Sequence, residues 1–354
     1  MAARRSTPAR THALAVALVA SASASAVSAR EYNGILKYQP SIPGNAVIGA
    51  VYTLLAAVFF YYVWRHKTKW ALCLPIGAAC SAVGFFIRCA LDPDTVTTGI
   101  YATMMLLVVL SPAAFLAFNY LLYGRWIAAL DPDFGRQPLS DRQAQKNRKW
   151  YHRRRDGPLL ERSHYSLLPP RLVGRFFIWS DVFTFLIQSA AGGIQASADA
   201  DYKKAQLGDN LFLAGVTLQG ISYLVFTLLI VVAVFRMRKL GGAQRSSRFL
   251  PANHPIMKMF FLFLFSSLCI IIRSVYRIVE FSQGYDGYLN RHEIYLFLLD
   301  ALPLILAIGT WVAIWPSTLL DKGAQRVRED LQLTSVESGE LKANPPSPPM
   351  VATR

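Results

Sequence analysis

Seven predominantly apolar stretches, each long enough to cross a bilayer as a helix, restrict the fold of this chain more than any other feature. They are Gly44–Trp64, Trp70–Ala90, Thr97–Leu122, Leu172–Ala196, Leu207–Phe235, Ile256–Phe281 and Ile294–Trp315. A helix needs about 20 apolar residues to span the hydrocarbon core, whereas a membrane β-barrel shows short strands of alternating polarity. The pattern therefore predicts an all-α, polytopic membrane bundle of seven transmembrane helices.

The distribution of basic residues predicts the orientation of this bundle. A formal net charge of +16 would suggest nucleic-acid binding in a soluble protein. Most of the 37 Lys and Arg, however, follow the first, third and fifth stretches or the seventh, and the other connections hold only Lys203, Lys204 and Arg291. The positive-inside rule then predicts an N-terminus outside the cytosol and a cytosolic C-terminus. Nucleic acid is not an expected partner.

The chain divides into a membrane domain and its flanking segments. At the N-terminus, basic residues precede an apolar stretch and then small residues, which resembles a cleavable signal peptide; a Ser/Ala-rich disordered tail is the alternative. Prolines near the C-terminus predict disorder. The predicted segments are a signal peptide (1–29), a short extracellular segment (30–43), the seven-helix domain (44–317) and a disordered cytosolic tail (318–354).

A long basic connection at residues 124–171 is the predicted cytosolic loop between the third and fourth helices. Its mixture of Pro, Gly and charged residues cannot bury a core. The stretch Arg148–Arg155 predicts contact with anionic headgroups, at about 1 kcal/mol per basic residue near the surface. A topology anchor without lipid recognition is the alternative interpretation.

Charged residues inside the predicted spans are few, and such residues mark functional sites by default. Arg88 lies at the outer end of the second span. Arg273, Arg277 and Glu280 follow an i, i+4, i+7 pattern and so share one face of the sixth. Asp300 lies at similar depth in the seventh span, which predicts an ion pair with Arg273 or Arg277. We take these five residues as a candidate substrate-binding or translocation site; a buried ion pair that only locks two helices together is the alternative.

A second polar line follows the fourth span, where Asp181, Gln188 and Gln195 recur every seven residues and so lie on nearly one side. Gln219 in the fifth span reaches similar depth, and Gly192–Gly193 would permit close helix approach. Asp181 and Gln188 therefore join the candidate site as residues lining a polar cleft. Hydrogen bonds that hold two helices together are the alternative.

Catalytic and metal-binding patterns are not recognisable in the sequence. The six His lie outside the interiors of the spans, and the four Cys fall within or at the ends of spans with no metal-ligand spacing. A Gly-rich phosphate loop with its Lys is also absent from the sequence. The sequence thus predicts a protein that is not an enzyme and that carries no metal or cofactor.

The sixth and seventh stretches carry a family resemblance. The order R-S-V-Y-R-I-V-E at 273–280, then His292-Glu293, Asp300 and Trp315-Pro316, resembles the fungal lipid-translocating exporter family. Segments of the third and fourth spans agree, so that the resemblance covers about residues 38–317. The family usually has a Glu where this chain has Ser81, and proton coupling through a carboxylate at that position is therefore not implied.

The resemblance implies a seven-span transporter or flippase-like exporter of amphiphilic lipids, such as sphingoid bases, sterol-like or other toxic amphiphiles. Such a protein would contribute to lipid asymmetry or drug resistance, with the plasma membrane as the expected location. A zwitterionic headgroup could pair with both signs of charge in the candidate site while its tail stays in lipid. Two alternatives are a heptahelical sensor that signals through its cytosolic loops and a scaffold for another transporter.

Overall fold

The computed structural model describes residues 40–91, 97–130, 163, 165–197, 202–243, 254–284, 287–327 and 329, and regular structure in these ranges is entirely helical. The elements are α2 (Ile42–His66), the 3-10 turn η1 (Lys69–Ala71), α3 (Cys73–Cys89), α4 (Thr98–Leu130), α7 (Pro170–Ala196), α8 (Tyr202–Ala243), α9 (Pro255–Ser282), α10 (Tyr288–Arg291), α11 (Glu293–Tyr295), the π-helical turn η2 (Leu296–Ala301) and α12 (Leu302–Ala313). Residues 316–327 are helical as well.

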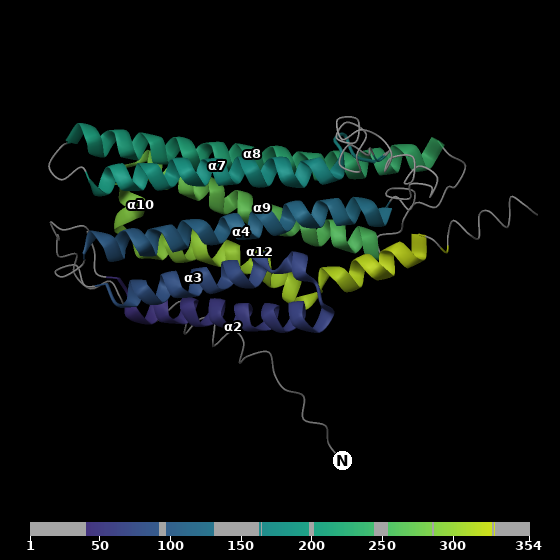
Figure 1. Ribbon diagram of the computed structural model, residues 1–354, viewed down its shortest axis with the longest axis horizontal. Coiled ribbons are helices and arrows are strands. Elements are labelled where there is room, and N and C mark those ends of the chain that lie inside the picture. Colours follow the sequence, from purple (N-terminus) through teal and green to yellow (C-terminus); the bar gives the residue numbers. More distant parts are fainter. Residues whose placement is uncertain are drawn as a thin grey trace, which may run out of the picture. The chain divides into compact units, whose positions relative to one another are not determined.

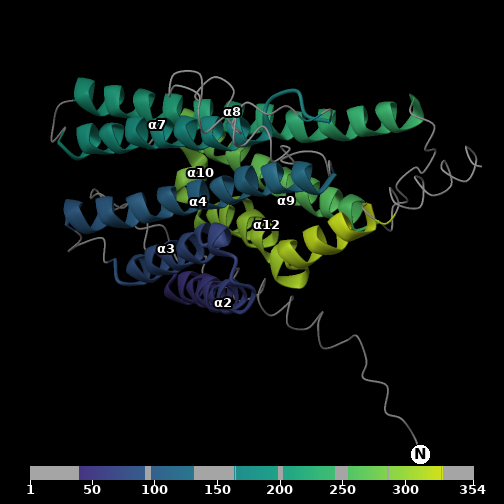
Figure 2. The same cartoon turned by 45° about the vertical axis from the view of Figure 1, so that its right-hand side comes forward.

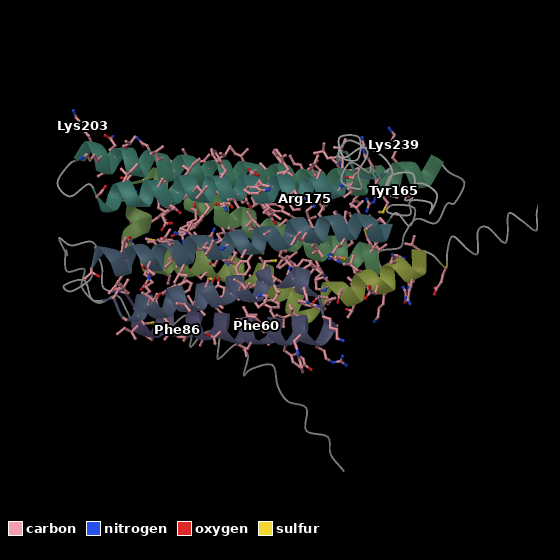
Figure 3. All side chains as sticks on the ribbon, viewed as in Figure 1. Phe60, Phe86, Tyr165, Arg175, Lys203 and Lys239 are labelled. Atoms are coloured by element: carbon pink, nitrogen blue, oxygen red, sulfur yellow. The ribbon has the colours of Figure 1, made fainter. Side chains whose placement is uncertain are left out.

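Seven helical stretches in the described residues are long and apolar enough to cross a membrane, which confirms the predicted fold class. They are Ile42–His66, Lys69–Cys89, Gly99–Leu130, Leu172–Gln195, Lys203–Lys239, Pro255–Ser282 and Glu293–Ala313. The third and fifth run further than predicted, because charged and polar residues continue the helix beyond its apolar part. Figure 3 shows Lys203 and Lys239 near the two ends of α8. The orientation of the termini stays a prediction.

Local chemistry explains how the first two spans become neighbours. Ser41 caps α2, since its Oγ accepts a hydrogen bond from the backbone N–H of Gly44 at 3.4 Å. At the other end, Lys67 adopts a left-handed conformation (φ 52°) and its N–H donates to the carbonyl of Trp64. This reversal and η1 return the chain into α3, which lies beside α2 in both views (Figures 1 and 2).

The chain separates into two compact units. Unit 1 contains the described residues of Met1–Leu116, Ser180–Ser222 and Leu268–Val312. Its interior includes a stacked pair of rings, Tyr52 and Phe85, with centroids 5.8 Å apart, and the fully buried Phe59 and Leu74. The charged residues of the sixth and seventh spans belong to this unit.

Unit 2 contains the described residues of Ala117–Trp179, Tyr223–Ser267 and Ala313–Arg354. Its core is aromatic: Tyr120 meets Phe226 edge to face at 4.6 Å and stacks on Phe177 at 5.4 Å. A buried chain of hydrogen bonds runs from the amide of Asn119 to the hydroxyl of Tyr223 (2.8 Å) and on to Ser267 (3.1 Å). These three polar side chains of the core are thus linked to one another.

Large apolar side chains on the outside of the helices fit a lipid environment. Phe60 of α2 and Phe86 of α3, labelled in Figure 3, are 47% and 44% exposed. In water such an apolar surface would promote aggregation. In a bilayer it is stable, because the lipid tails that surround it are apolar as well. The protein is a multi-pass membrane protein.

Several predicted segments fall largely outside the described residues. The predicted signal peptide at 1–29 lies outside them entirely, as do residues 30–39 of the extracellular segment and 131–162 of the cytosolic loop. Residues 124–130 of that predicted loop continue helix α4. The predicted disordered tail from residue 318 begins with helical residues up to 327, where the helix approaches α9: an added Cβ at Gly323 would lie 2.7 Å from Ile256.

Candidate functional site

Six charged side chains gather inside unit 1, three arginines and three carboxylates. Helix α3 supplies Arg88, helix α9 supplies Arg273, Arg277 and Glu280, and the last span supplies Glu293 and Asp300. All six have side chains that are at most 12% exposed. We call this set the charged cluster; its formal charges balance.

Asp300 is the centre of the charged cluster. Its carboxylate holds Arg277 in a two-pronged pair, with Nε to Oδ1 at 2.6 Å and Nη2 to Oδ2 at 2.7 Å. Such fork-to-fork pairs are among the strongest that side chains form. Arg273 approaches the same Oδ1 with its Nε at 2.9 Å. The ion pair predicted across the sixth and seventh spans is confirmed, and both arginines take part.

The third nitrogen of Arg277 completes the link along α9. Its Nη1 donates to Oε2 of Glu280 at 3.1 Å, one helical turn away, and the hydroxyl of Tyr276 donates to Oε1 of the same carboxylate at 3.2 Å. The shared face predicted from the i, i+4, i+7 spacing is therefore a continuous network. Every nitrogen of the Arg277 guanidinium has a carboxylate partner.

Glu293 ties α2 to the last span. Its Oε2 accepts from the backbone N–H of Ser41 at 2.7 Å, and its Oε1 accepts from the amide of Asn45 at 2.7 Å and lies 3.3 Å from Nε of Arg88. A carboxylate at a helix N-terminus satisfies unpaired N–H groups and complements the helix dipole. One carboxylate thus joins the start of α2, the end of α3 and the start of the last span.

The backbone around Asp300 is irregular. Asp300 lies in the π-helical turn η2, and the carbonyl of the next residue, Ala301, accepts from the hydroxyl of Tyr52 at 3.4 Å. π-helical turns are rare and occur frequently at functional sites. Tyr52 is itself close enough to Asp300, Arg273 and Arg277 to interact with them electrostatically. Tyr52 is therefore a fully buried residue of α2 that lies next to the charged cluster.

The polar line predicted on the fourth span forms a separate set of contacts in unit 1. Gln188 of α7 donates to Gln219 of α8 at 3.1 Å, and Gln195 donates to Asp209 at 2.6 Å. Asp181 is buried, and its backbone carbonyl accepts from Thr184 at 2.9 Å. Helices α7 and α8 lie side by side in both views (Figures 1 and 2). The two hydrogen bonds between side chains, from Gln188 and from Gln195, join α7 to α8.

Comparison with known proteins places the chain in a family. The sequence pattern of the family described as RTA1 like protein matches residues 74–139 and 159–323, which include the whole charged cluster. The chain belongs to the RTA1-like protein family. No solved structure matches this RTA1-like chain.

Three relatives from Saccharomyces cerevisiae illustrate the similarity. Protein RTM1 is 27% identical over 65% of this chain and 62% of its own length, and Protoporphyrin uptake protein 1 is 27% identical over 66% and 64%. Sphingoid long-chain base transporter RSB1 is 28% identical over 43% of this chain and 47% of its own length. The RTA1-like chain thus spans less than two thirds of the length of each of these relatives.

The structure places five of the seven predicted site residues of this RTA1-like protein in the charged cluster, where four are linked by direct contacts and Arg88 pairs with Glu293. Arg88, Arg273, Arg277, Glu280 and Asp300 belong to the charged cluster, whereas Asp181 and Gln188 lie on α7 among the contacts just described. The candidate site predicted from the sequence did not include Glu293, Asn45 or Tyr276. The signal for Glu293 was an acidic residue at the start of the last span, opposite in sign to Arg88 and predicted to lie at the same end of the membrane.

Close approach of α7 and α8 occurs at glycines other than those predicted. A Cβ added at Gly215 would lie 2.8 Å from Cγ of Gln188, and one at Gly208 would lie 2.6 Å from Cγ of Gln195. At Gly192 and Gly193 a Cβ would meet nothing within 4 Å. The glutamines of α7 therefore sit against glycines of α8, because only a residue without a side chain leaves room for them.

These glycines give a matched pair of substitutions. Gly215→Ala is expected to lower the free energy of unfolding by about 1–3 kcal/mol, because the added methyl overpacks against Gln188. Gly192→Ala is the control and should be neutral or stabilising by up to about 1 kcal/mol, since alanine favours a helix where space is open. Thermal unfolding in detergent measures both. Equal effects of the two substitutions would contradict the close packing of the Gln188 side chain against Gly215.

Metal-binding groups of three or more His, Cys, Asp or Glu do not occur in the described part of this RTA1-like chain. Its four cysteines are free thiols. The absence of a resident metal or cofactor stays a prediction. The chemistry that the charged cluster offers is recognition of charge and exchange of hydrogen-bond partners.

Proposed function

We propose that this protein is a membrane transporter that translocates amphiphilic lipids, among them lipids with charged headgroups, as a flippase-like exporter. The substrates would be sphingoid bases, sterol-like compounds or other toxic amphiphiles, and the protein would contribute to lipid asymmetry or drug resistance at the plasma membrane. Membrane lipids would then be the substrates of the protein as well as the medium around it. The basic loop at 124–171 would bind anionic lipid headgroups.

The charged cluster is the observation that carries this proposal. A charged side chain at the centre of a membrane helix costs about 2.5–3.5 kcal/mol on insertion scales. Buried ion pairs seldom repay their desolvation, and apolar residues of similar volume are often equally stable. Six charges inside one unit are therefore better explained by exchange with a charged ligand than by the stability of the bundle.

The names of two relatives support a substrate of this chemical type. One is called a protoporphyrin uptake protein and another a sphingoid long-chain base transporter. A porphyrin with carboxylate groups and a long-chain amine share little except a charged end and a large apolar body. A site that holds both signs of charge beside lipid suits either.

Reconstitution into liposomes tests the proposal. Purified protein is expected to move a fluorescent sphingoid base, phospholipid or sterol between leaflets faster than protein-free liposomes do. The double variant Arg277→Met/Asp300→Leu, which replaces the central ion pair by apolar side chains, should lose this activity at least about ten-fold while remaining folded, if the pair contributes a charged hydrogen bond to translocation. Arg175→Gln, at an exposed residue of α7 (Figure 3), is the control.

Two results would contradict the proposal. If the double variant transports as well as wild type, the ion pair is only a lock between helices. If folded wild-type protein moves none of the lipids, direct transport fails, and a sensor or a scaffold for another transporter becomes the better account. Loss of a signalling output on deletion of residues 134–165 would then favour the sensor.

A further inference from the structure

The six residues of the charged cluster use their hydrogen-bonding capacity unequally. Both oxygens of Asp300 accept from Arg277, and the two oxygens of Glu280 accept from Tyr276 and Arg277. Both oxygens of Glu293 accept from α2. Each carboxylate of the charged cluster therefore has a donor on both of its oxygens.

Arg273 differs from the other members. Within the described ranges, its one close charged contact is Nε to Oδ1 of Asp300 at 2.9 Å, and this Nε makes no hydrogen bond there. Nη1 and Nη2 hydrogen-bond to none of the residues that the structure describes. The Arg273 side chain is 12% exposed, against 4–10% for the rest of the charged cluster. Arg273 therefore has unused donors and the most exposed side chain of the charged cluster.

A guanidinium with an unused edge is a receptor for anions. It offers five N–H donors in a planar fork that matches the two oxygens of a carboxylate or phosphate. An incoming anion would pair with Arg273 and leave the Asp300–Arg277 pair intact. An incoming ammonium would first have to displace an arginine from a carboxylate, at the expense of a charge-assisted pair.

We propose that Arg273 binds the anionic headgroup, a carboxylate or phosphate, of the transported amphiphile. This inference rests on the proposed function and narrows its substrate class from charged amphiphiles to acidic or zwitterionic ones. A pure cation such as an unmodified long-chain base is then a poorer ligand than an amphiphile that carries an acidic group.

The position of Arg273 on α9 suits a ligand with an apolar tail. Arg273 lies nine positions before Ser282, the last residue of the helix, which places it about 14 Å along the helix axis from that end. The neighbouring Ile272 and Val275 are 43% and 54% exposed on the outside of the same helix. Residues one and two positions apart point to different faces of a helix. These two side chains therefore show that α9 borders hydrocarbon, where the tail of a ligand can remain, but they do not line the face of Arg273.

Binding of matched short-chain amphiphiles tests the inference without requiring transport. Octyl phosphate, octyltrimethylammonium and inorganic phosphate are titrated calorimetrically into the full-length protein in nanodiscs, with empty nanodiscs subtracted. The dissociation constant of octyl phosphate should rise by about ten- to hundred-fold in Arg273→Gln. It should rise less in Arg273→Lys, which keeps the charge but loses the fork, and not at all in Arg175→Gln. Octyltrimethylammonium should bind wild type more weakly than octyl phosphate does, and Arg273→Gln should not weaken it further.

The outcomes separate this inference from the proposed function. Unchanged octyl phosphate binding in folded Arg273→Gln protein overturns it, and so does tighter binding of the ammonium than of the phosphate. If Arg273→Gln fails to fold, unchanged binding in Arg273→Lys overturns it instead. Inorganic phosphate that binds as tightly as octyl phosphate assigns Arg273 to a free anion rather than to a headgroup. If octyl phosphate binding depends on Arg273 but the protein moves no lipid, the proposed transport function is rejected and the anion site at Arg273 is retained.

Discussion

Asp300→Leu is expected to lower the free energy of unfolding by about 3–5 kcal/mol, the usual effect of removing one partner from a buried ion pair. Asp300 accepts from Arg277 at 2.6 Å and 2.7 Å and lies 2.9 Å from Arg273. Without it, Arg277 keeps only its contact with Glu280, and Arg273 loses its contact with a carboxylate. Thermal unfolding in detergent measures the loss.

Arg277→Met introduced into the Asp300→Leu chain should restore part of that stability. The double variant leaves Arg273 and Glu280 with balanced charge, and apolar replacements of buried pairs are often tolerated. Loss of lipid movement in a double variant that is as stable as wild type would separate the role of the charges in transport from their role in packing. A single variant Asp300→Leu that unfolds at the wild-type temperature would contradict the arrangement described for Asp300.

Glu293→Ala is expected to cost about 3 kcal/mol of unfolding free energy, because it removes the acceptor shared by α2 and Arg88. The expected effect is largest at the start of α2, where the Ser41 N–H donates to Glu293 at 2.7 Å. Hydrogen exchange of the first turn of α2 should therefore accelerate more than exchange in the middle of the same helix. Mass spectrometry of the protein in detergent resolves the two regions.

Arg88→Ala supplies the control for that substitution. It removes the 3.3 Å contact to Glu293 but leaves the two hydrogen bonds from α2 in place, so that its cost should be smaller. The double variant should be less destabilised than the sum of the single variants, since the two residues contact each other. Additive effects would show that Arg88 and Glu293 act independently.

The membrane fold could be predicted from the sequence because each span carries its own signal. Length and apolarity alone locate a membrane helix, and the seven predicted stretches match the seven observed ones. The third and fifth observed spans are longer, since polar residues such as Lys203 and Lys239 still continue a helix where it leaves the hydrocarbon. Hydropathy does not register that extension.

The charged cluster was predictable only where its pattern is local. The spacing of Arg273, Arg277 and Glu280 gives one helix face without knowledge of any neighbour, and the depth of Asp300 identified its partners. The role of Glu293 depends on the start of α2, which lies beside it in space. The sequence alone does not reveal that the two segments are neighbours. The same applies to Gly215: whether a glycine permits close packing depends on the side chain that the opposite helix brings to it.

The π-helical turn η2 makes the length of the last span important as well as its composition. A π turn holds more residues per turn than an α-helix does, which amounts to one inserted residue. Deleting a single residue between Glu293 and η2, with the π turn retained, would rotate Glu293 and Asp300 relative to each other by about 100° around the helix axis. Near the end of a membrane helix a one-residue change in length is usually absorbed by a small tilt. Between Glu293 and Asp300 in this protein, it would separate one of these carboxylates from its partners, because Glu293 is held by α2 and Asp300 by Arg277.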